Sequence, residues 1–223
     1  MNLTKIGILG SGDVGKVLAA GYAKHGFPVM IGSRSPAKLQ VFVAEQKLDH
    51  LSCGTFAETA AFGETLILAS AGYAAMECLQ ACGESNLADK VVIDATNPLK
   101  KDGTFPPPGC VVEFFSPPGH NSLMEALQAE FPKVKFVKGF NSLGNSFMID
   151  PDFGDVKPVM FICGNDAEAK AHVKELIEKV GHNVQDFGPA AVAGPMESLC
   201  QLWCARGFYT GQWNHAFALL QKE

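Results

Sequence analysis

The feature that most constrains this chain is a glycine-rich turn directly after its first apolar segment. Residues 5–9 are largely apolar, and the sequence then reads Gly10-Ser11-Gly12-Asp13-Val14-Gly15 before a helical pattern begins. In a strand–turn–helix unit, the spacing Gly-x-Gly-x-x-Gly allows a tight turn, close approach of the backbone to a pyrophosphate, and close packing of helix on strand. The free N–H groups at the start of the helix attract the phosphates. The turn therefore predicts dinucleotide binding, with residues 10–15 at the pyrophosphate.

The end of the second predicted strand indicates which dinucleotide binds. A site for NAD carries Asp or Glu there, to bind the 2′-hydroxyl of the adenine ribose. This chain has Ser33, Arg34 and Ser35 at that point, and Lys38 follows one helical turn later. Two cations and two hydroxyls attract a 2′-phosphate, which a carboxylate would repel. The sequence therefore favours NADP(H); the alternatives are that Arg34 stacks on the adenine or is a solvated surface residue.

Length and composition fit one large α/β domain. The 223 residues are 47% hydrophobic and 18% charged, which is typical of a well-packed globular core. A net charge of −5 without any basic run argues against nucleic acid as a partner. No apolar stretch reaches the ~20 residues that cross a bilayer, and the N-terminus opens on a predicted strand instead of a secretory signal. We therefore expect a cytoplasmic protein without a membrane segment.

The seven cysteines and six histidines are scattered through the sequence. Cys78/Cys82 and Cys200/Cys204 have i, i+4 spacing, whereas structural metal and iron–sulfur sites normally use Cys-x-x-Cys pairs. We interpret the cysteines as buried apolar thiols in a reducing compartment. No metal site is predicted.

Strand and helix patterns alternate along the chain. Strands are predicted at residues 5–9, 28–32, 65–70, 90–95, 134–140, 158–163 and 184–187, and helices at residues 14–25, 36–47, 58–62, 73–82, 121–131, 166–180 and 195–208. This alternation predicts a Rossmann-type α/β fold, a doubly wound parallel sheet with a short C-terminal helical extension. We expect residues 1–188 to form the NADP(H)-binding domain. Residues 189–223 would form a helical segment packed on that domain or on the partner of a homodimer.

Ligands of such a sheet bind outside the carboxyl ends of its strands. The predicted strand ends carry glycine or small polar residues, namely Gly10, Ser33, Ser70, Asn97 and Asn141. We therefore expect these strand ends to line a single binding crevice. A long Pro/Gly-rich loop, residues 98–119, follows one of them.

Four segments together resemble a known family. They are residues 10–16 (Gly-Ser-Gly-Asp-Val-Gly-Lys), 32–35 (Gly-Ser-Arg-Ser), 94–98 (Asp-Ala-Thr-Asn-Pro) and 137–143 (Val-Lys-Gly-Phe-Asn-Ser-Leu). In this order they are similar to the NADP oxidoreductases that depend on the deazaflavin coenzyme F-420, a family related to the NADPH domain of the STEAP metalloreductases. The resemblance extends over nearly the whole chain, including its C-terminal apolar helix.

The resemblance implies which residues surround NADP(H). The pyrophosphate would lie on residues 10–14, and the 2′-phosphate on Ser33, Arg34 and Lys38. The residues implied near the ribose and the nicotinamide are Ser70, Ala71, Asn97, Pro98, Phe140 and Asn141. Asparagine side chains offer both donors and acceptors there.

Two features depart from the family pattern where a second substrate would bind. The central strand of the family often ends in an aliphatic–proline pair, whereas this chain has Ser70-Ala71-Gly72. The loop 98–119 is unusually rich in proline. The chain therefore differs most from the family in the residues where the hydride acceptor would bind.

No catalytic residue is assigned with certainty. Hydride transfer between two planar rings needs orientation and exclusion of water more than side-chain acid–base chemistry. Tyr73 and His120 are weak candidates for a proton donor, and we interpret both first as packing or capping residues. Asp94 is interpreted as a structural turn carboxylate. None of the three tyrosines has a lysine four residues later, so the Tyr-x-x-x-Lys pair of short-chain dehydrogenases is missing.

The sequence thus predicts an oxidoreductase that transfers a hydride between NADP(H) and a deazaflavin (coenzyme F-420) or flavin-like acceptor. The alternatives are reduction of a small carbonyl, imine or ferric chelate, and a non-catalytic NADPH-binding redox sensor. A sensor would contact its partner through the apolar C-terminal segment, which equally suits a homodimer interface or packing over the sheet. The apolar residues concerned include Leu199, Leu202, Phe208 and Phe217.

Overall fold

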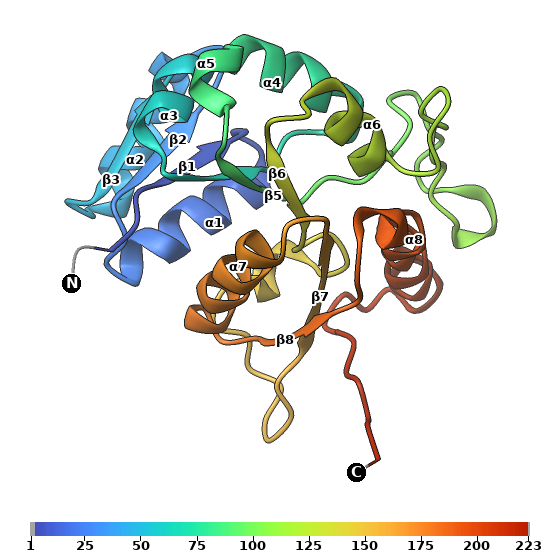
Figure 1. Cartoon of the computed structure of the whole chain (residues 1–223). Coiled ribbons are helices and arrows are strands. Elements are labelled where there is room, and N and C mark those ends of the chain that lie inside the picture. The colour runs from blue at the N-terminus through green and yellow to red at the C-terminus, as the bar shows by residue number, and fades with distance from the viewer. Residues whose placement is uncertain (1–2, 223) are drawn as a thin grey trace.

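An eight-stranded sheet forms the centre of the computed structural model, which describes residues 3–222. Its strands are β1 (Ile6–Leu9), β2 (Val29–Gly32), β3 (Leu51–Gly54), β4 (Thr65–Leu68), β5 (Val91–Asp94), β6 (Lys135–Lys138), β7 (Val159–Gly164) and β8 (Asn183–Asp186). They lie in the order β3-β2-β1-β4-β5-β6-β7-β8 (Figure 1). The first six follow the 3-2-1-4-5-6 order of doubly wound dinucleotide-binding sheets. The predicted Rossmann-type fold is therefore confirmed.

Helices cover both faces of this sheet. One face carries α3 (Phe56–Phe62), α4 (Ala75–Cys82), α5 (Glu84–Leu87) and α6 (Leu123–Glu130); the other carries α1 (Asp13–Lys24), α2 (Gln40–Gln46) and α7 (Ala167–Lys179) (Figure 1). Because strand side chains alternate between the faces, each face has its own apolar core. Ile8 and Ile67 point into one core, and Leu9 and Leu68 into the other.

One strand pair of the predicted doubly wound parallel sheet is antiparallel. Strand β7 runs antiparallel to β6 and pairs with it only at Val137–Gly164 and Lys138–Cys163, whereas every other adjacent pair is parallel. A parallel connection needs a crossover that returns the chain to the opposite end of the sheet. Residues 139–158 contain only the 3₁₀ turn η4 (Asn145–Phe147), so the chain re-enters the sheet from the end it has just left.

Two short elements were not predicted from the sequence. Strand β3 and helix α5 have four residues each, too few for a hydrophobic period to be recognised. The predicted helix 36–47 begins as a 3₁₀ turn, η1 (Pro36–Leu39), and continues as α2. The other predicted strands and helices are present with shifted boundaries.

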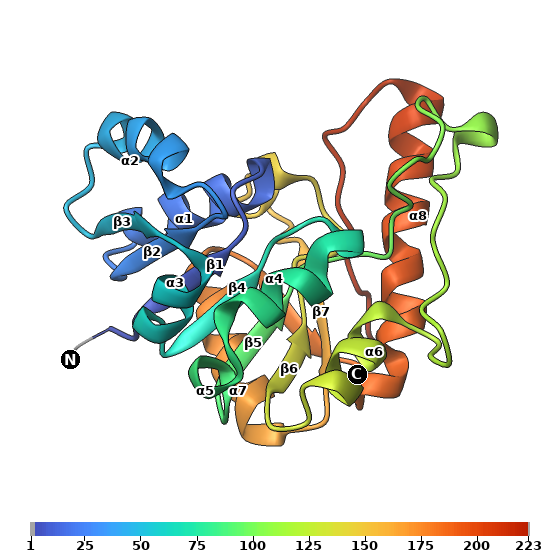
Figure 2. The same ribbon diagram turned by 90° about the horizontal axis from the view of Figure 1, so that it is seen from above.

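The predicted loop 98–119 is irregular and lies beside the last helix, α8 (Ala193–Thr210) (Figure 2). At its base the backbone of Leu99 pairs with that of Phe114, and the Lys100 N–H donates to the Glu113 carbonyl at 2.9 Å. A 3₁₀ turn within the loop, η3 (Pro108–Cys110), contacts α8.

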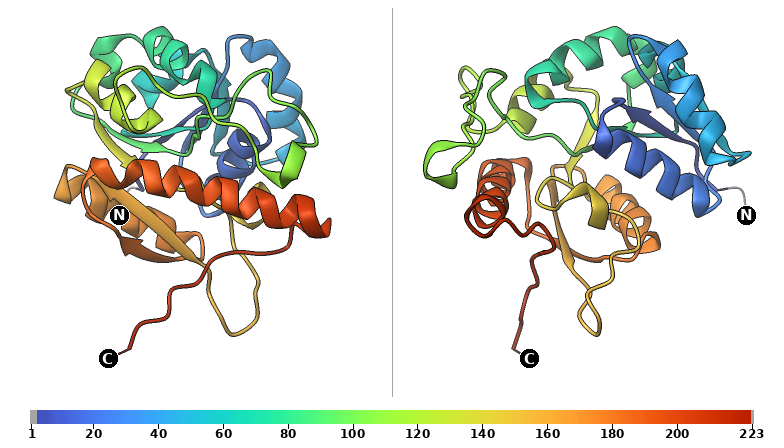
Figure 3. Two further views of the ribbon diagram at one scale, coloured as in Figure 1. Left: turned by 90° about the vertical axis from the view of Figure 1, so that its right-hand side faces the viewer. Right: turned by 180° about the vertical axis from the view of Figure 1, so that it is seen from behind.

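Helix α8 lies along the side of the sheet that ends in β7 and β8, and an extended segment follows it (Figure 3). Leu199 and Phe217 pack against the buried core, whereas Leu202 is exposed. The segment therefore packs on this chain's own fold, and the division at residue 188 stays a prediction. Within residues 3–222 no helix combines the length and the apolarity needed to cross a membrane.

Candidate dinucleotide site

The three glycines of the turn differ in their surroundings. Gly10 has a φ of 139°, and a Cβ there would collide with the carbonyl group of Ala69 at the end of β4. A Cβ on Gly15 would collide with the carbonyl oxygen of Gly10. Around Gly12, in contrast, no atom lies within 4 Å of such a Cβ. Gly10 and Gly15 therefore permit the turn and its packing, and Gly12 leaves open space above it.

The start of α1 faces this open space. Its N-cap is Gly12, and no side chain within residues 3–222 caps the helix. The first N–H groups of a helix have no partner inside it, and the helix dipole makes this end positive. The N-terminal end of α1 can therefore bind an anion such as a pyrophosphate.

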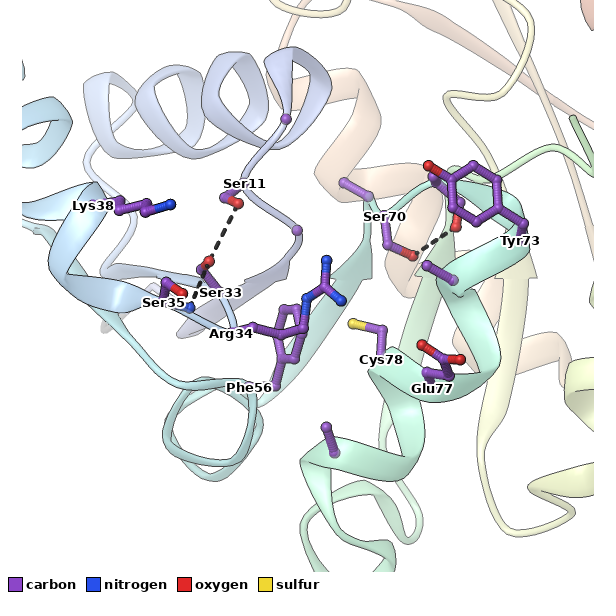
Figure 4. A pocket seen from close by; sticks show the side chains of 16 residues that line it. Ser11, Ser33, Arg34, Ser35, Lys38, Phe56, Ser70, Tyr73, Glu77 and Cys78 are labelled. Atoms are coloured by element: carbon purple, nitrogen blue, oxygen red, sulfur yellow. Dashed lines mark hydrogen bonds between the residues drawn. The ribbon is translucent and has the colours of Figure 1, made fainter. Parts of the chain in front are cut away.

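A cavity of about 410 Å³ opens beside the turn (Figure 4). We call it the first cavity. Its predicted lining residues are Gly10, Ser11, Gly12, Ser33, Arg34, Ser35, Lys38, Ser70, Ala71 and Tyr73. The carboxyl ends of β1, β2 and β4 and the 3₁₀ turn η2 (Gly72–Ala74) bring them together, because parallel strands end at the same edge of the sheet. The cavity is large enough for part of a dinucleotide.

The β2 side of the first cavity is basic. The Arg34 guanidinium extends from the end of β2 into the cavity (Figure 4). Neither Arg34 nor Lys38 forms an ion pair within the described part of the chain. The Ser11 hydroxyl donates to the Ser33 hydroxyl at 3.4 Å, and the Ser35 N–H donates to the same oxygen at 3.1 Å. Two unpaired cations beside an ordered pair of hydroxyls fit a phosphate monoester.

Several lining residues were missed by sequence reasoning. They come from α3 and α4 and from the turn before α4, and they are Phe56, Ala74, Glu77, Cys78 and Ala81. None of these residues directly follows a predicted strand end, and they reach the cavity only because α3 and α4 pack over the sheet. A hydrogen bond with Cys82 and burial raise the pKa of Cys78 far above its usual range. The Cys78 thiol is therefore neutral and forms an apolar wall.

A second cavity, of about 310 Å³, lies on the other side of the turn. Asp13, Val14 and Ala95 line it, and it shares Gly12, Ala69, Ser70 and Ala71 with the first cavity. The two cavities therefore adjoin along the ends of β1 and β4, where the strand order of the sheet reverses. This switch point is where ligands of doubly wound sheets bind.

The remaining predicted residues line neither the first nor the second cavity. The amide groups of Asn97 and Asn141 are linked, since Asn97 Nδ2 donates to the Asn141 carbonyl at 2.8 Å and Asn141 Nδ2 donates to Asn97 Oδ1 at 3.1 Å. Phe140 lines neither cavity, because its side chain is fully buried and packs edge-on against His182. Gly15 lies beneath the turn, and Pro98 lines a third cavity beside loop 98–119.

The two weak catalytic candidates lie apart from any acid–base pair. Tyr73 lines the first cavity, is half-exposed, and has the Lys101 ammonium 5.8 Å from its ring centre. His120 is exposed and lines the third cavity, of about 320 Å³, together with Pro98 and Glu197. Neither side chain forms a hydrogen bond that would orient it within residues 3–222. The geometry supplies no oriented proton donor.

The interpretation of Asp94 as a turn carboxylate is confirmed. Its Oδ1 accepts from the Thr96 N–H at 2.9 Å and from the Thr96 hydroxyl at 2.6 Å. Asp94 also pairs with the buried Lys138 ammonium at 2.7 Å, a contact that was not predicted from the sequence. All seven cysteines are free and four of them are buried. Within the described residues no group of three metal-ligating side chains forms.

The fold, the glycine-rich turn at residues 10–15 and the basic end of β2 together define a Rossmann-type protein that binds a phosphorylated dinucleotide. Residues 5–98 match the family model described as NADP oxidoreductase, coenzyme F-420-dependent. The whole fold is similar to a candidate F-420-dependent NADP reductase from Arthrobacter sp. FB24, with 32% sequence identity and a TM-score of 0.87, over 98% of this chain and 100% of that chain. The chain belongs to the coenzyme F-420-dependent NADP oxidoreductase family.

Two further similarities are more distant. The metalloreductase STEAP3 of Rattus norvegicus is 28% identical over 195 residues, which cover 87% of this chain and 36% of that protein. The chain thus spans about a third of the length of the curated relatives it matches. A reductive aminase from Aspergillus terreus in complex with NADPH and ethyl levulinate shares the fold, with 22% identity and a TM-score of 0.65, over 94% of this chain and 63% of that chain.

Proposed function

We propose that this protein transfers a hydride between NADP(H) and a planar deazaflavin or flavin-like acceptor. One observation carries the proposal: the first and second cavities share a wall at Gly12, Ser70 and Ala71. Among residues 3–222, the cations at one end of this groove are unpaired and the other end has no oriented acid–base pair. A dinucleotide lies along such a groove, its phosphates at the helix start and its redox ring at the far end. Hydride transfer between rings suits a groove of this kind.

In this arrangement the adenosine half of NADP(H) occupies the first cavity. Ser33, Arg34, Ser35 and Lys38 bind the 2′-phosphate, and the turn at residues 10–15 binds the pyrophosphate. The flat side of Phe56 and the neutral thiol of Cys78 provide apolar contact for the base.

The nicotinamide then occupies the second cavity, near Val14, Ala71 and Ala95. The strand ends here are close-packed, since a Cβ on Gly72 would collide with the Asn97 carbonyl oxygen. Such packing keeps water from one side of the ring. The acceptor stacks on the other side, next to loop 98–119 and the start of α8. NADP(H) supplies the hydride, and the protein binds and orients the two rings.

The proposal is tested by following NADPH oxidation with the purified protein. Coenzyme F-420, FAD, FMN and a ferric chelate are supplied in parallel reactions, together with a reaction that lacks an acceptor. Rapid turnover with coenzyme F-420, or with a free flavin, supports the proposal and tells which ring is used. Turnover with the ferric chelate alone overturns the choice of acceptor. Tight NADPH binding without turnover on any acceptor favours the redox sensor.

A further inference from the structure

Three charged side chains are buried together at the ends of β5 and β6. Lys138, the last residue of β6, is completely buried, and its ammonium lies 2.7 Å from Asp94 Oδ2 and 2.8 Å from Glu197 Oε1. Burial opposes the charge of this lysine, but the two carboxylates outweigh it and raise the pKa of Lys138. The lysine is therefore protonated at neutral pH. Charged groups are rarely buried so completely, because their desolvation is costly.

The cluster joins the strand ends to two helices. The Lys138 ammonium also donates to the Thr96 carbonyl at 2.9 Å, next to the hydrogen bonds from Thr96 to Asp94. Glu197, on α8, accepts from the N–H groups of Leu123 and Met124 at 3.0 and 3.2 Å, at the start of α6. The ammonium thus contacts both the segment before Asn97 and the carboxylate on α8.

Asn97 and Asn141 each lie three residues after the end of one of the two strands that this cluster connects, β5 and β6. Phe140 has a φ of 59°, a left-handed conformation that is costly for a residue with a side chain. It turns the chain so that Asn141 meets Asn97, and Asn141 Nδ2 also donates to the Met196 carbonyl at 2.8 Å, one residue before Glu197. The asparagine pair is therefore held from both strands and from α8.

One atom of this pair lacks a partner. Asn141 Oδ1 is buried and accepts no hydrogen bond within residues 3–222. Buried polar atoms are nearly always hydrogen-bonded in folded proteins. An N–H donor of a ligand would satisfy this oxygen, and the carboxamide of nicotinamide carries such a donor.

We propose that Lys138 is a positioning residue for the nicotinamide end of NADP(H). Through Thr96 on one side and Glu197 on the other, it fixes Asn97 and Asn141 relative to each other and to α8. This inference rests on the proposed placement of NADP(H), and it adds a residue that contacts neither cavity. An apolar side chain at position 138 would fill the same space without directing Thr96 or Glu197. Directed contacts matter because a displacement of about 1 Å in a reacting ring costs about a hundredfold in rate.

The first test compares two ligands that differ at the nicotinamide end. NADPH occupies both cavities, whereas adenosine 2′,5′-bisphosphate occupies only the adenosine side. In Lys138→Met the dissociation constant of NADPH is expected to rise by about tenfold, the loss of roughly one hydrogen-bonded contact. The dissociation constant of adenosine 2′,5′-bisphosphate is expected to stay within about twofold of its value in the parent chain. Equal weakening of both ligands, or of neither, overturns the positioning role.

Lys135 offers a matched control on the same strand. Its ammonium pairs with Asp166 at 3.1 Å, at the opposite end of β6 from Lys138. Lys135→Met removes the same side chain and one ion pair, far from the asparagines. It is expected to leave both dissociation constants unchanged. A selective loss of NADPH affinity in this control would likewise overturn the inference.

If Lys138→Met does not fold, a second variant tests the same positioning role. Glu197→Gln keeps one oxygen, which accepts from only one of the two N–H groups at the start of α6, and it removes the charge that pairs with Lys138. This variant is expected to show the same selective loss of NADPH affinity as Lys138→Met. Lys138→Arg keeps the positive charge, so its NADPH affinity is expected to lie between those of Lys138→Met and the parent chain. With a working acceptor, kcat in Lys138→Met falls by about a hundredfold while KM for the acceptor changes little. Failure of the proposed acceptor leaves the binding comparison intact, so the two hypotheses fail separately.

Discussion

Gly15 packs directly against the backbone carbonyl of Gly10, so tightly that a methyl group on Gly15 would collide with the Gly10 oxygen. Gly12 lies between them in the sequence and faces open space. One short motif therefore combines a glycine required for packing with a glycine whose space is free for a ligand. The two roles can be separated by substitution.

Gly15→Ala is expected to destabilise the fold. The added methyl group forces α1 away from the turn, and overpacking of this kind costs about 1–3 kcal/mol. Unfolding by urea, followed by circular dichroism, measures the change in the free energy of unfolding. An unchanged midpoint would show that the turn relaxes freely around the methyl group.

Gly12→Ala is expected to leave stability within about 0.5 kcal/mol of the parent chain, because its methyl group meets no atom and its φ of −74° suits alanine. NADPH affinity should nevertheless fall, since the methyl group occupies the space that a pyrophosphate needs. Isothermal titration calorimetry with NADPH measures the loss. Parent-like affinity would place the pyrophosphate elsewhere.

Arg34→Ala and Lys38→Ala are each expected to weaken NADPH binding far more than NADH binding. A hydrogen bond to a charged group contributes about 1.5–3 kcal/mol, or roughly 10- to 150-fold in affinity. The ratio of the two dissociation constants measures recognition of the 2′-phosphate. For Arg34, an equal loss of both cofactors would assign the guanidinium to stacking on the adenine. The preference for NADPH should also weaken as salt rises.

Tyr73→Phe and His120→Ala are expected to change kcat by no more than about twofold. A side chain that donates a proton in the rate-limiting step contributes about 10²–10⁴-fold, and neither residue has a partner that would orient it. Steady-state turnover with the acceptor that the NADPH-oxidation experiment identifies gives kcat directly. A hundredfold loss in either variant would make that residue a proton donor.

Helix α3 allows a test of pH dependence. Thr55 and Glu58 form a reciprocal cap, in which the Thr55 N–H and hydroxyl donate to Glu58 at 2.7 and 2.8 Å and the Glu58 N–H donates to the Thr55 hydroxyl at 3.2 Å. Hydrogen bonds from the Thr55 backbone and side chain lower the pKa of Glu58 from its usual 4.5. Thr55→Ala should cost about 1 kcal/mol at neutral pH.

The sign of the pH effect follows from the lowered pKa. The contribution of the ionised Glu58 is present above pH 4.5 and is lost as the pH falls through its lower folded-state pKa. The gap in unfolding midpoint between Thr55→Ala and the parent chain should therefore narrow in acid. A gap that stays constant from neutral pH to about pH 3 would show that the hydrogen bond from the Thr55 hydroxyl to Glu58 contributes nothing to the cap.

The first part of the site was predictable because its signals are local. The glycine spacing, the apolar strand before it and the basic end of β2 all lie within 38 residues of the N-terminus. The structure gathers Ser33, Arg34 and Lys38 in the first cavity. Strand ends could be listed from the sequence because the carboxyl ends of parallel strands share one edge of a sheet.

The rest of the site depends on packing between distant segments. Glu77 and Cys78 reach the first cavity through the placement of α4 over the sheet. Phe140 was expected at the nicotinamide, but its left-handed backbone turns the ring into the core. The reversal of β7 likewise depends on a connection without a crossover helix.

The sequence by itself determined the fold class, the dinucleotide turn and the preference for a 2′-phosphate, because each rests on residues close together in the chain. Only the tertiary structure decided which charges are buried. Asp94, Lys138 and Glu197 are far apart in sequence, and each alone resembles a surface residue. They meet because β5 and β6 are neighbours and α8 packs across their ends, and burial makes their mutual attraction strong enough to hold them there.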